Sequence, residues 1–240
     1  MFPMPIWRLV LLHLLPGALA TLVFIFLADS VQAAGYPPLA ALLIAIAVVI
    51  IPFELGVVYF AGRGEPGLLS AVPYRERVPL RDWLLLVGAL VVVGILGFGL
   101  IGIIEPPIRD ALFGWLPSWM LNPLPTDAIG AYSSSAWTTT LGAYLVLNVF
   151  AGPITEELYF RGYLLPRMGQ FGRWAPLVNT VLFSLYHFWS PWQFLSRIAG
   201  VAPFAYVVWW KRNVYLGMAV HVLLNGIGTL AVVVYVMNQL

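Results

Sequence analysis

The chain has 240 residues, of which 61% are hydrophobic and only 9% are charged, against roughly 25% charged residues in an ordinary soluble domain. Its net charge is +2, but the basic residues are spread between apolar runs and form no patch that would bind nucleic acid. Because the chain has no cysteine, disulfides, thiolate zinc sites and cysteine nucleophiles are excluded. These properties predict an all-α, polytopic membrane protein that forms a single integral membrane domain over residues 1–240.

Apolar runs of about 20 residues have the length that crosses a hydrocarbon core of about 30 Å. Seven such spans are predicted in a helical bundle, and the fifth and sixth are short and separated only by the turn-like Ser190 and Pro191. A re-entrant hairpin is the alternative for that pair. The long loop from Glu105 to Trp137 is expected to rest on the outer interface. The predicted spans cover approximately residues 8–29, 38–61, 83–104, 138–166, 174–189, 194–210 and 214–237.

Basic residues fall in alternate loops, which predicts a cytoplasmic amino terminus and a carboxyl terminus on the other side. Arg197 is the one basic residue that does not fit this alternation. Tryptophans near the span ends are expected to act as interfacial anchors. The expected location is therefore the inner (plasma) membrane of the cell. The basic residues are Arg8, Arg63, Arg75, Arg77, Arg81, Arg167, Arg173, Lys211 and Arg212, and the tryptophans are Trp7, Trp83, Trp137, Trp174, Trp189, Trp192, Trp209 and Trp210.

Polar and ionisable residues inside the spans are few, and such residues are functional candidates by default. Glu157 and Arg161 are four residues apart and can neutralise each other on one helix face. Glu156 is rotated by about 100° from Glu157 and is left without an intrahelical cation. Phe183 with His187, and His221 with Asn225, repeat the four-residue spacing. The full set is Glu54, Glu156, Glu157, Arg161, Phe183 with His187, and His221 with Asn225, while His13 lies near the inner end of the first span.

The helical rise of about 1.5 Å per residue predicts a common depth for four of these residues. Glu156, His187, His221 and Asn225 each lie about 14 to 20 Å from the nearest inner basic residue. We therefore expect a buried catalytic centre that opens toward the inner face.

Several of these residues also have plain structural interpretations. His187 alone is typical of an interhelical hydrogen bond, and Glu157 with Arg161 is typical of a helix-positioning pair. Glu54 is expected either as a second partner of Arg161 or in a water-filled cavity. His13 is expected to be structural.

The three motifs in this order resemble the CPBP family, also called Abi, of CAAX-protease-like membrane proteins. They are E-E-x-x-x-R from Glu156 to Arg161, F-x-x-x-H from Phe183 to His187, and H-x-x-x-N from His221 to Asn225. The resemblance covers a core of approximately residues 138–237. Eukaryotic members remove the last three residues of prenylated C-terminal CaaX sequences, and their eight spans make eight the alternative count here.

The resemblance also implies a role for each motif residue. Glu156 would activate a water molecule, assisted by His187. His221 and Asn225 would stabilise the oxyanion that develops on the substrate. Glu157, Arg161 and Phe183 would support the architecture. The implied substrate is a membrane-embedded, membrane-associated or lipidated peptide or protein, in contact with membrane lipids and without nucleic acid.

Metal use and activity leave alternatives open. The family is described both as zinc-dependent and as metal-independent, and Glu156, His187 and His221 would be the three zinc ligands. The absence of H-E-x-x-H and the amide of Asn225 favour a centre with no cofactor. A non-proteolytic membrane binding or scaffold protein, or a bacteriocin self-immunity protein, is the main alternative function. A proton-coupled carrier using Glu54, Glu156 and the histidines is less favoured, because paired halves with broken helices are missing.

Overall fold

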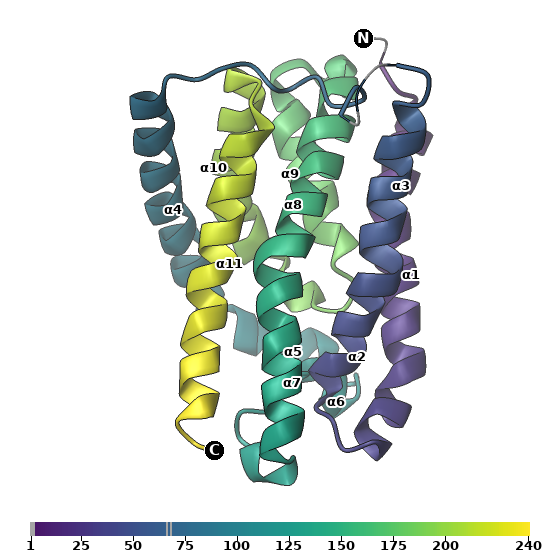
Figure 1. Ribbon diagram of the computed structural model, residues 1–240, viewed down its shortest axis with the longest axis vertical. Coiled ribbons are helices and arrows are strands. Elements are labelled where there is room, and N and C mark those ends of the chain that lie inside the picture. The colour runs from purple at the N-terminus through teal and green to yellow at the C-terminus, as the bar shows by residue number, and fades with distance from the viewer. Residues whose placement is uncertain (1–2, 66, 68) are drawn as a thin grey trace.

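The computed structural model describes residues 3–65, 67 and 69–240. Its helices run mostly along the long axis of the molecule, and the two chain ends lie at opposite ends of the bundle (Figure 1). In the described residues the only extended pairing is an antiparallel bridge between Arg75 and Asn213. The predicted all-α class is therefore confirmed.

Four long helices of the described residues are apolar enough to cross a membrane. They correspond to the first, second, third and seventh predicted spans. The chain is thus an integral membrane protein by the composition of these helices, while the total of seven or eight spans stays a prediction. The four are α1 (Ile6–Ala33), the combined α2 (Pro38–Ala45), η1 (Ile46–Ile50) and α3 (Ile51–Ala61), α4 (Leu80–Gly102), and α11 (Val214–Met237).

The fourth predicted span is one helical path with wider π-type turns in it. α7 (Ser134–Tyr144), η3 (Leu145–Ala151), α8 (Gly152–Glu156) and η4 (Glu157–Leu164) follow one another without a break. Pro153 at the start of α8 has no N–H to give to the preceding turn, and such interruptions are a common cause of π-bulges. Pro52 follows η1 in the same way. The two interrupted helices pack together, since α3 contacts α8 and η4.

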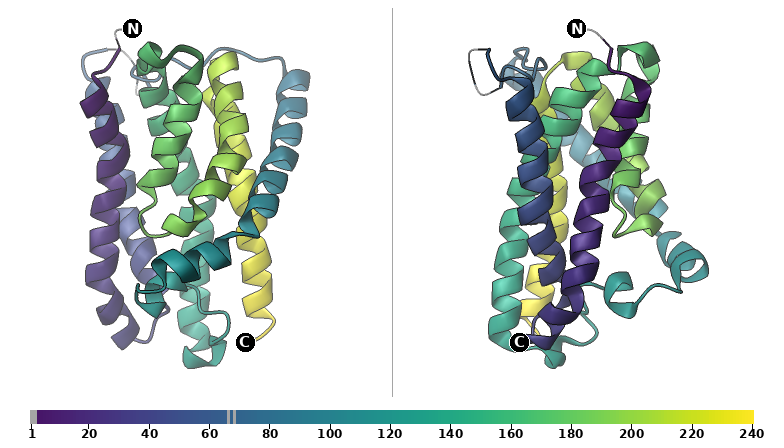
Figure 2. Two further views of the ribbon diagram at one scale, coloured as in Figure 1. Left: turned by 180° about the vertical axis from the view of Figure 1, so that it is seen from behind. Right: turned by 90° about the vertical axis from the view of Figure 1, so that its right-hand side faces the viewer.

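The fifth and sixth predicted spans form a hairpin whose turn lies inside the molecule. After η5 (Leu165–Arg167) and η6 (Gly169–Trp174), α9 (Ala175–Tyr186) leads through η7 (Pro191–Gln193) into α10 (Phe194–Lys211). Twelve residues of α9 give about 18 Å, which is too short to cross a hydrocarbon core. The turn lies partway along the bundle (Figure 2). The re-entrant alternative therefore describes this hairpin better than two complete spans.

The loop between the third and fourth predicted spans forms short helices that lie across the bundle in its lower half (Figure 2). No residue of α5 is buried, which agrees with a surface segment, although α5 also packs against η7. Met120 of α6 is buried. These elements are α5 (Glu105–Phe113), α6 (Ser118–Leu121) and η2 (Ile129–Ala131).

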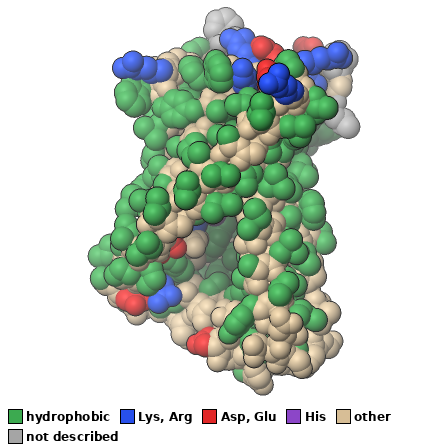
Figure 3. Space-filling model, turned by 90° about the vertical axis from the view of Figure 1, so that its left-hand side faces the viewer, with side chains coloured by type: hydrophobic (Ala, Val, Ile, Leu, Met, Phe, Trp, Pro, Cys, Tyr) green, Lys and Arg blue, Asp and Glu red, His purple; other side chains and the backbone are tan. Residues whose placement is uncertain are grey.

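Lysine and arginine side chains gather at the end of the bundle that holds the amino terminus (Figure 3). At that end the Val214 N–H donates to the Tyr74 carbonyl at 2.8 Å. Asn213 caps α11, because its Oδ1 accepts from the Leu216 N–H at 3.0 Å. The gathering agrees with the predicted alternation of basic loops, and the cytoplasmic location of this end stays a prediction.

The interfacial role predicted for the tryptophans holds only in part. Trp7, Trp174 and Trp210 are exposed, as anchors should be. Trp137 is instead fully buried and donates its indole N–H to the Ile129 carbonyl at 2.9 Å. Trp192 is also buried. The prediction was wrong for these two because the preceding loop and α11 cover Trp137, while Trp192 lies in the turn between α9 and α10.

Hydrogen bonds attach α1 to the motif-bearing helices. Pro16 lies inside α1 and leaves the Leu12 carbonyl without its helical donor, and the Tyr159 hydroxyl donates to that carbonyl at 2.7 Å. His13 is fully buried, and its Nε2 lies 3.0 Å from the Asn179 amide nitrogen. Its Nδ1 lies 2.7 Å from the Leu9 carbonyl. These contacts agree with the structural role expected for His13.

Candidate active site

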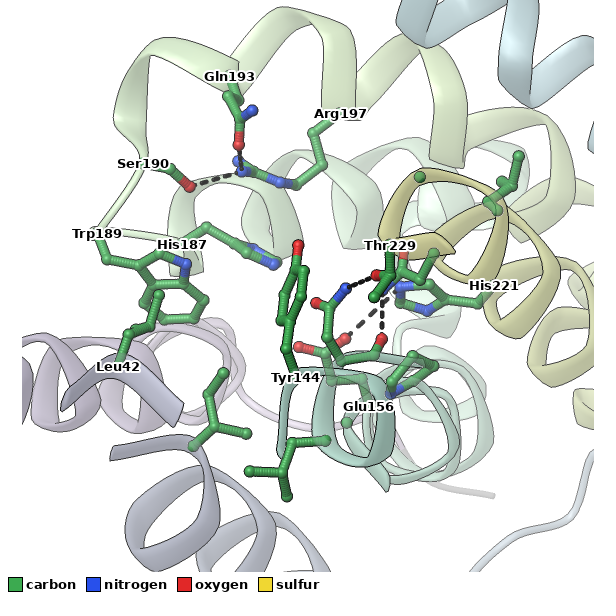
Figure 4. A pocket seen from close by; sticks show the side chains of 18 of the residues that line it. Leu42, Tyr144, Glu156, His187, Trp189, Ser190, Gln193, Arg197, His221 and Thr229 are labelled. Atoms are coloured by element: carbon green, nitrogen blue, oxygen red, sulfur yellow. Dashed lines mark hydrogen bonds and ion pairs between the residues drawn. The ribbon is translucent and has the colours of Figure 1, made fainter. Parts of the chain in front are cut away.

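A cavity of about 640 Å³ lies within the bundle and is lined by all four residues expected at a common depth. They come from α8, from the turn after α9, and from α11. Figure 4 shows Glu156 and His221 on one side and His187 on the other, with Tyr144 reaching between them. Spacing alone could not show that these helices face one another. The four residues are Glu156, His187, His221 and Asn225.

The cavity extends away from the basic end of the molecule. Its lining includes Leu121, Pro123 and Leu124, which belong to α6 and the loop after it. α6 lies at the end of the bundle opposite the amino terminus (Figure 1). The expectation that the centre opens toward the inner, basic face was therefore wrong. Helix lengths predict depth, but they do not show which spaces between helices stay unfilled.

Glu156 is held by a partner that the sequence motifs did not identify. The Tyr186 hydroxyl donates to its Oε1 at 3.0 Å, and its Oε2 lies 3.8 Å from His221 Nε2. Tyr186 is fully buried against Gly17 of α1, where a Cβ would lie 1.9 Å from the Tyr186 carbonyl oxygen. The position of Tyr186 just before His187 was the available signal, but its direction depends on this contact with α1.

Glu157 contacts two charged or chargeable side chains. Its Oε1 lies 3.1 Å from Arg161 Nη1 and 3.1 Å from His221 Nδ1. The four-residue pairing with Arg161 is therefore confirmed, and the contact with His221 was missed. Gly217, one turn before His221, makes room for it, since a Cβ there would lie 2.5 Å from Glu157 Oε2. Glu157 thus connects the predicted supporting pair to the predicted catalytic histidine.

Arg161 is fully buried among aromatic rings. Its guanidinium carbon lies 4.1 Å from the centre of the Phe183 ring, 5.9 Å from that of Phe160 and 5.4 Å from that of Phe204. A cation over an aromatic face is attracted by the ring quadrupole. Phe183 also packs edge-on against His187, with 4.8 Å between ring centres. Its predicted supporting role has a physical basis in these two contacts.

The hydrogen bonds define which nitrogen of each histidine faces the cavity. His187 Nδ1 lies 2.9 Å from the Phe183 carbonyl, which can only accept, so Nδ1 carries the proton. His221 Nδ1 lies beside the Glu157 carboxylate and is the donor there when that group is ionised. In the neutral rings, Nε2 is then free to accept a proton. Both histidines line the cavity.

Asn225 makes a bond that the motif did not predict. Its amide Nδ2 donates to the Asn148 carbonyl at 2.9 Å. The Gly152 N–H bonds to Leu147 in the π-bulge, and Pro153 has no N–H, so the helix itself leaves that carbonyl without a donor. Asn148 in turn donates to the Thr229 hydroxyl at 2.8 Å. Asn225 therefore closes the bulge, and its second amide hydrogen is available for the cavity.

We expect Asn225→Ala to lower the free energy of unfolding by about 1 to 3 kcal/mol, the usual cost of leaving a buried acceptor unsatisfied. The measurement is denaturant unfolding of the purified protein in nanodiscs, followed by tryptophan fluorescence. Asn238→Ala, at the exposed end of α11, is the matched control. Equal stability of the two variants would contradict a structural role for the bond to Asn148.

Glu54 does not line the cavity, and it interacts with the charge of Arg161 without forming an ion pair with it. It is fully buried, it is not among the residues that line the cavity, and both of its carboxylate oxygens lack a hydrogen-bond partner among the described residues. No ion pair of the described residues joins it to Arg161. It lies on α3, which packs against α8 and η4. The Tyr186 hydroxyl and the charge of Arg161 are the groups that act favourably on its carboxylate.

The predicted zinc alternative does not fit the side chains as they stand. Across residues 3–65, 67 and 69–240, no three histidine, aspartate or glutamate side chains are grouped so that they could hold a metal ion. The bonds of the cavity histidines to protein oxygens use Nδ1 in both rings, as zinc-binding histidines also do with their second nitrogen, so these bonds alone do not decide metal use. Metal independence stays a prediction, and no step below depends on a metal.

The comparison with protein families found a match to the family described as type II CAAX prenyl endopeptidase Rce1-like, over residues 138–227. Neither the curated proteins nor the solved structures gave a match. The matched segment begins in α7, ends in α11 and contains all three motifs. Within it lie Glu156, His187, His221 and Asn225, on the elements that enclose the cavity. Over this segment the chain is similar to the Rce1-like family, which is consistent with the CAAX-protease-like membrane proteins that its motifs resemble.

Proposed function

We propose that this protein is an intramembrane endopeptidase in which Glu156 activates a water molecule to attack a peptide bond. The observation that supports the proposal most is the shared cavity, where a carboxylate, two imidazoles and an amide from separate elements meet. A peptidase centre needs a base, a proton acceptor or donor, and hydrogen-bond donors for the oxyanion. No serine or threonine is required as a nucleophile.

Glu156 is the best-placed general base. Tyr186 holds one carboxylate oxygen, and the other lies on the side of His221. A water molecule between Glu156 and the Nε2 atom of a histidine would be oriented for attack, and its proton would pass to the carboxylate. His187 would assist from the other side of the cavity. Its Nδ1 bonds to the Phe183 carbonyl, so its Nε2 takes no part in that bond.

His221 and Asn225 are the proposed oxyanion donors. For Nε2 of His221 to donate, the ring must carry both protons, because Nδ1 faces Glu157. The adjacent Glu157 carboxylate balances that charge, and Arg161 balances the carboxylate. Preset donors in a site without bulk water are typically worth about 2.7 to 4 kcal/mol each in transition-state stabilisation. The supporting pair therefore also sets the charge of the oxyanion site.

The substrate class follows from the setting of the cavity. Apolar side chains make up most of its lining, including Leu42, Leu43, Ile46 and Phe98. A membrane-embedded or lipidated peptide would enter such a space more readily than a soluble one. We place the protein in the plasma membrane with a cytoplasmic amino terminus and assign it no cofactor. A non-proteolytic binding or scaffold role is the alternative, and the cavity alone is compatible with it.

The test is cleavage of a panel of lipidated and unlipidated membrane peptides by the purified protein in nanodiscs, with products identified by mass spectrometry. In water enriched in ¹⁸O, direct attack by water predicts one heavy oxygen in each new carboxylate after a single turnover. Cleavage that survives in Glu156→Gln would contradict the mechanism. If wild type cleaves no peptide while binding them, the binding role replaces the proposal.

A further inference from the structure

Arg197 is a buried cation in the cavity that the proposed mechanism does not use. Its side chain is only 7% exposed, and it lines the cavity together with Glu156 and His187. It is also the basic residue that did not fit the alternation of basic loops. Lying fourteen residues before Lys211 in α10, it is about 21 Å from the basic end of that helix. A cation at this depth requires compensation.

The protein compensates this charge only partly. Arg197 donates to three uncharged oxygens, and no ion pair of the described residues includes it. Its link to a carboxylate is indirect. The Gln193 side-chain oxygen accepts from Arg197, and the Gln193 amide nitrogen donates to Glu105 at 3.4 Å. A guanidinium has five N–H groups, so two remain without a partner among the described residues. The three acceptors are the Ser184 carbonyl at 3.3 Å, the Ser190 hydroxyl at 2.8 Å and the Gln193 side-chain oxygen at 3.0 Å.

The location of Arg197 favours an anion that arrives with a ligand inside the cavity. Figure 4 shows its guanidinium above His187, at the edge of the space bounded by Glu156 and His221. Lipid phosphates lie in the headgroup region, outside a hydrocarbon core of about 30 Å, whereas Arg197 is in the first turn of α10, next to the α9–α10 turn that lies partway along the bundle (Figure 2). Carboxylates are the anions that peptides carry, and guanidinium groups recognise them through charge-assisted hydrogen bonds.

We propose that Arg197 forms an anion subsite that binds the free C-terminal carboxylate of a peptide held in the cavity. This proposal rests on the proposed function, because it assigns the peptide's orientation relative to Glu156. The carboxylate would complete the charge balance of Arg197, and the remaining peptide would extend past His187 toward the catalytic carboxylate. A peptide whose C-terminus is blocked as an amide would lose this contact. The guanidinium would then keep only the three uncharged acceptors that it has in the free protein.

A purely structural role for Arg197 makes a different prediction. The same hydrogen bonds join Ser184 and Ser190 on either side of His187, so Arg197 also fixes the turn that carries this histidine. If that were its whole role, substitution would weaken binding of acid and amide peptides equally. A comparison of the two peptide ends therefore separates the roles without relying on catalytic activity.

The experiment measures binding of a short dansylated apolar peptide, as the free acid and as the C-terminal amide, to Glu156→Gln protein in phosphatidylcholine nanodiscs. We expect the acid to bind at least about tenfold more tightly than the amide, as a charge-assisted contact would give. Arg197→Gln should remove the difference, and Arg197→Lys should retain part of it. Arg212→Gln, at an exposed position, is the control and should change nothing.

A second variant gives a change of opposite sign and does not disturb Arg197 itself. Glu105→Gln keeps one acceptor oxygen, which can serve Ser196, loses the acceptor for Gln193 and removes the negative charge, so the acid should bind several-fold more tightly and the amide should not change. Any of three results would overturn the subsite. They are equal binding of acid and amide, an acid preference that survives Arg197→Gln, and no binding of either peptide.

Adding phosphatidylglycerol to the nanodiscs tests the other anion source. Competition by this lipid would assign Arg197 to lipid phosphate and overturn the peptide assignment.

These outcomes differ from those of the cleavage test. Failure of wild type to cleave any peptide would remove the peptidase proposal, while a preference for the acid would still establish the subsite in a binding protein. Cleavage of acid and amide with the same KM would leave the peptidase standing and overturn the subsite.

Discussion

Glu156→Gln should lower the rate of peptide cleavage by about 10²- to 10⁴-fold, the range that a general base contributes. Glutamine keeps the size of the side chain and an acceptor for the Tyr186 hydroxyl, but it cannot take a proton from water. The measurement is the single-turnover rate of product formation in nanodiscs with saturating peptide. Peptide binding should change little, because the substitution removes an interaction that is needed only in the transition state.

The control for this variant is Glu76→Gln. Glu76 forms an exposed ion pair with Arg212 at 3.4 Å, far from the cavity, so its rate should equal that of wild type. A Glu156→Gln protein that retained more than about a tenth of the wild-type rate would contradict general-base catalysis by this residue. In that event another group that lines the cavity, such as His187, would have to supply the base.

Arg161→Ala should lower the free energy of unfolding by about 3 to 5 kcal/mol, as expected when one member of a buried ion pair is removed. The substitution leaves the Glu157 carboxylate fully buried beside His221 without its cation. It also leaves a space among three phenylalanine rings. Thermal denaturation of the purified protein and its yield from membranes are the measurements.

Two comparisons make the Arg161 result specific. Arg212→Ala breaks an ion pair whose side chains are 65% and 60% exposed, and it should cost less than about 1 kcal/mol. Replacing both partners, as Glu157→Gln with Arg161→Met, should recover much of the stability, since no unpaired charge remains. The double variant should stay inactive, because His221 then lacks the carboxylate at its Nδ1. Equal stability of Arg161→Ala and Arg212→Ala would show that the pair is not held in a dry interior.

Local periodicity accounts for the parts of the site that were predicted correctly. The pairing of Glu157 with Arg161, the turn at Ser190 and Pro191, and the shared depth of the four cavity residues each depend on spacing along one element. The rise of a helix converts sequence distance into depth even where π-turns alter it slightly. The family match over residues 138–227 includes all three motifs, so the two lines of reasoning agree.

The parts that were missed depend on how separate helices meet. The Tyr186 hydroxyl reaches Glu156 only because α1 approaches closely at Gly17. Asn225 was predicted to face the substrate, yet one of its amide hydrogens binds a carbonyl freed by the bulge before Pro153. A proline in a sequence shows that a carbonyl will be released, but the side chain that satisfies it is found only in the folded bundle.

The contacts between α1 and the later helices have a consequence for biosynthesis. Tyr159 lies 147 positions after Leu12, and Asn179 lies 166 positions after His13. At about 5 to 20 residues per second, synthesis of the first interval takes roughly 7 to 30 s. Throughout that time α1 has left the ribosome with the Leu12 carbonyl unpaired and with only one nitrogen of the His13 ring, the one beside Leu9, provided with a partner. We therefore expect the amino-terminal half of α1 to stay in contact with water or with the insertion machinery until the motif-bearing helices arrive, so that insertion is completed by the carboxyl-terminal half of the chain.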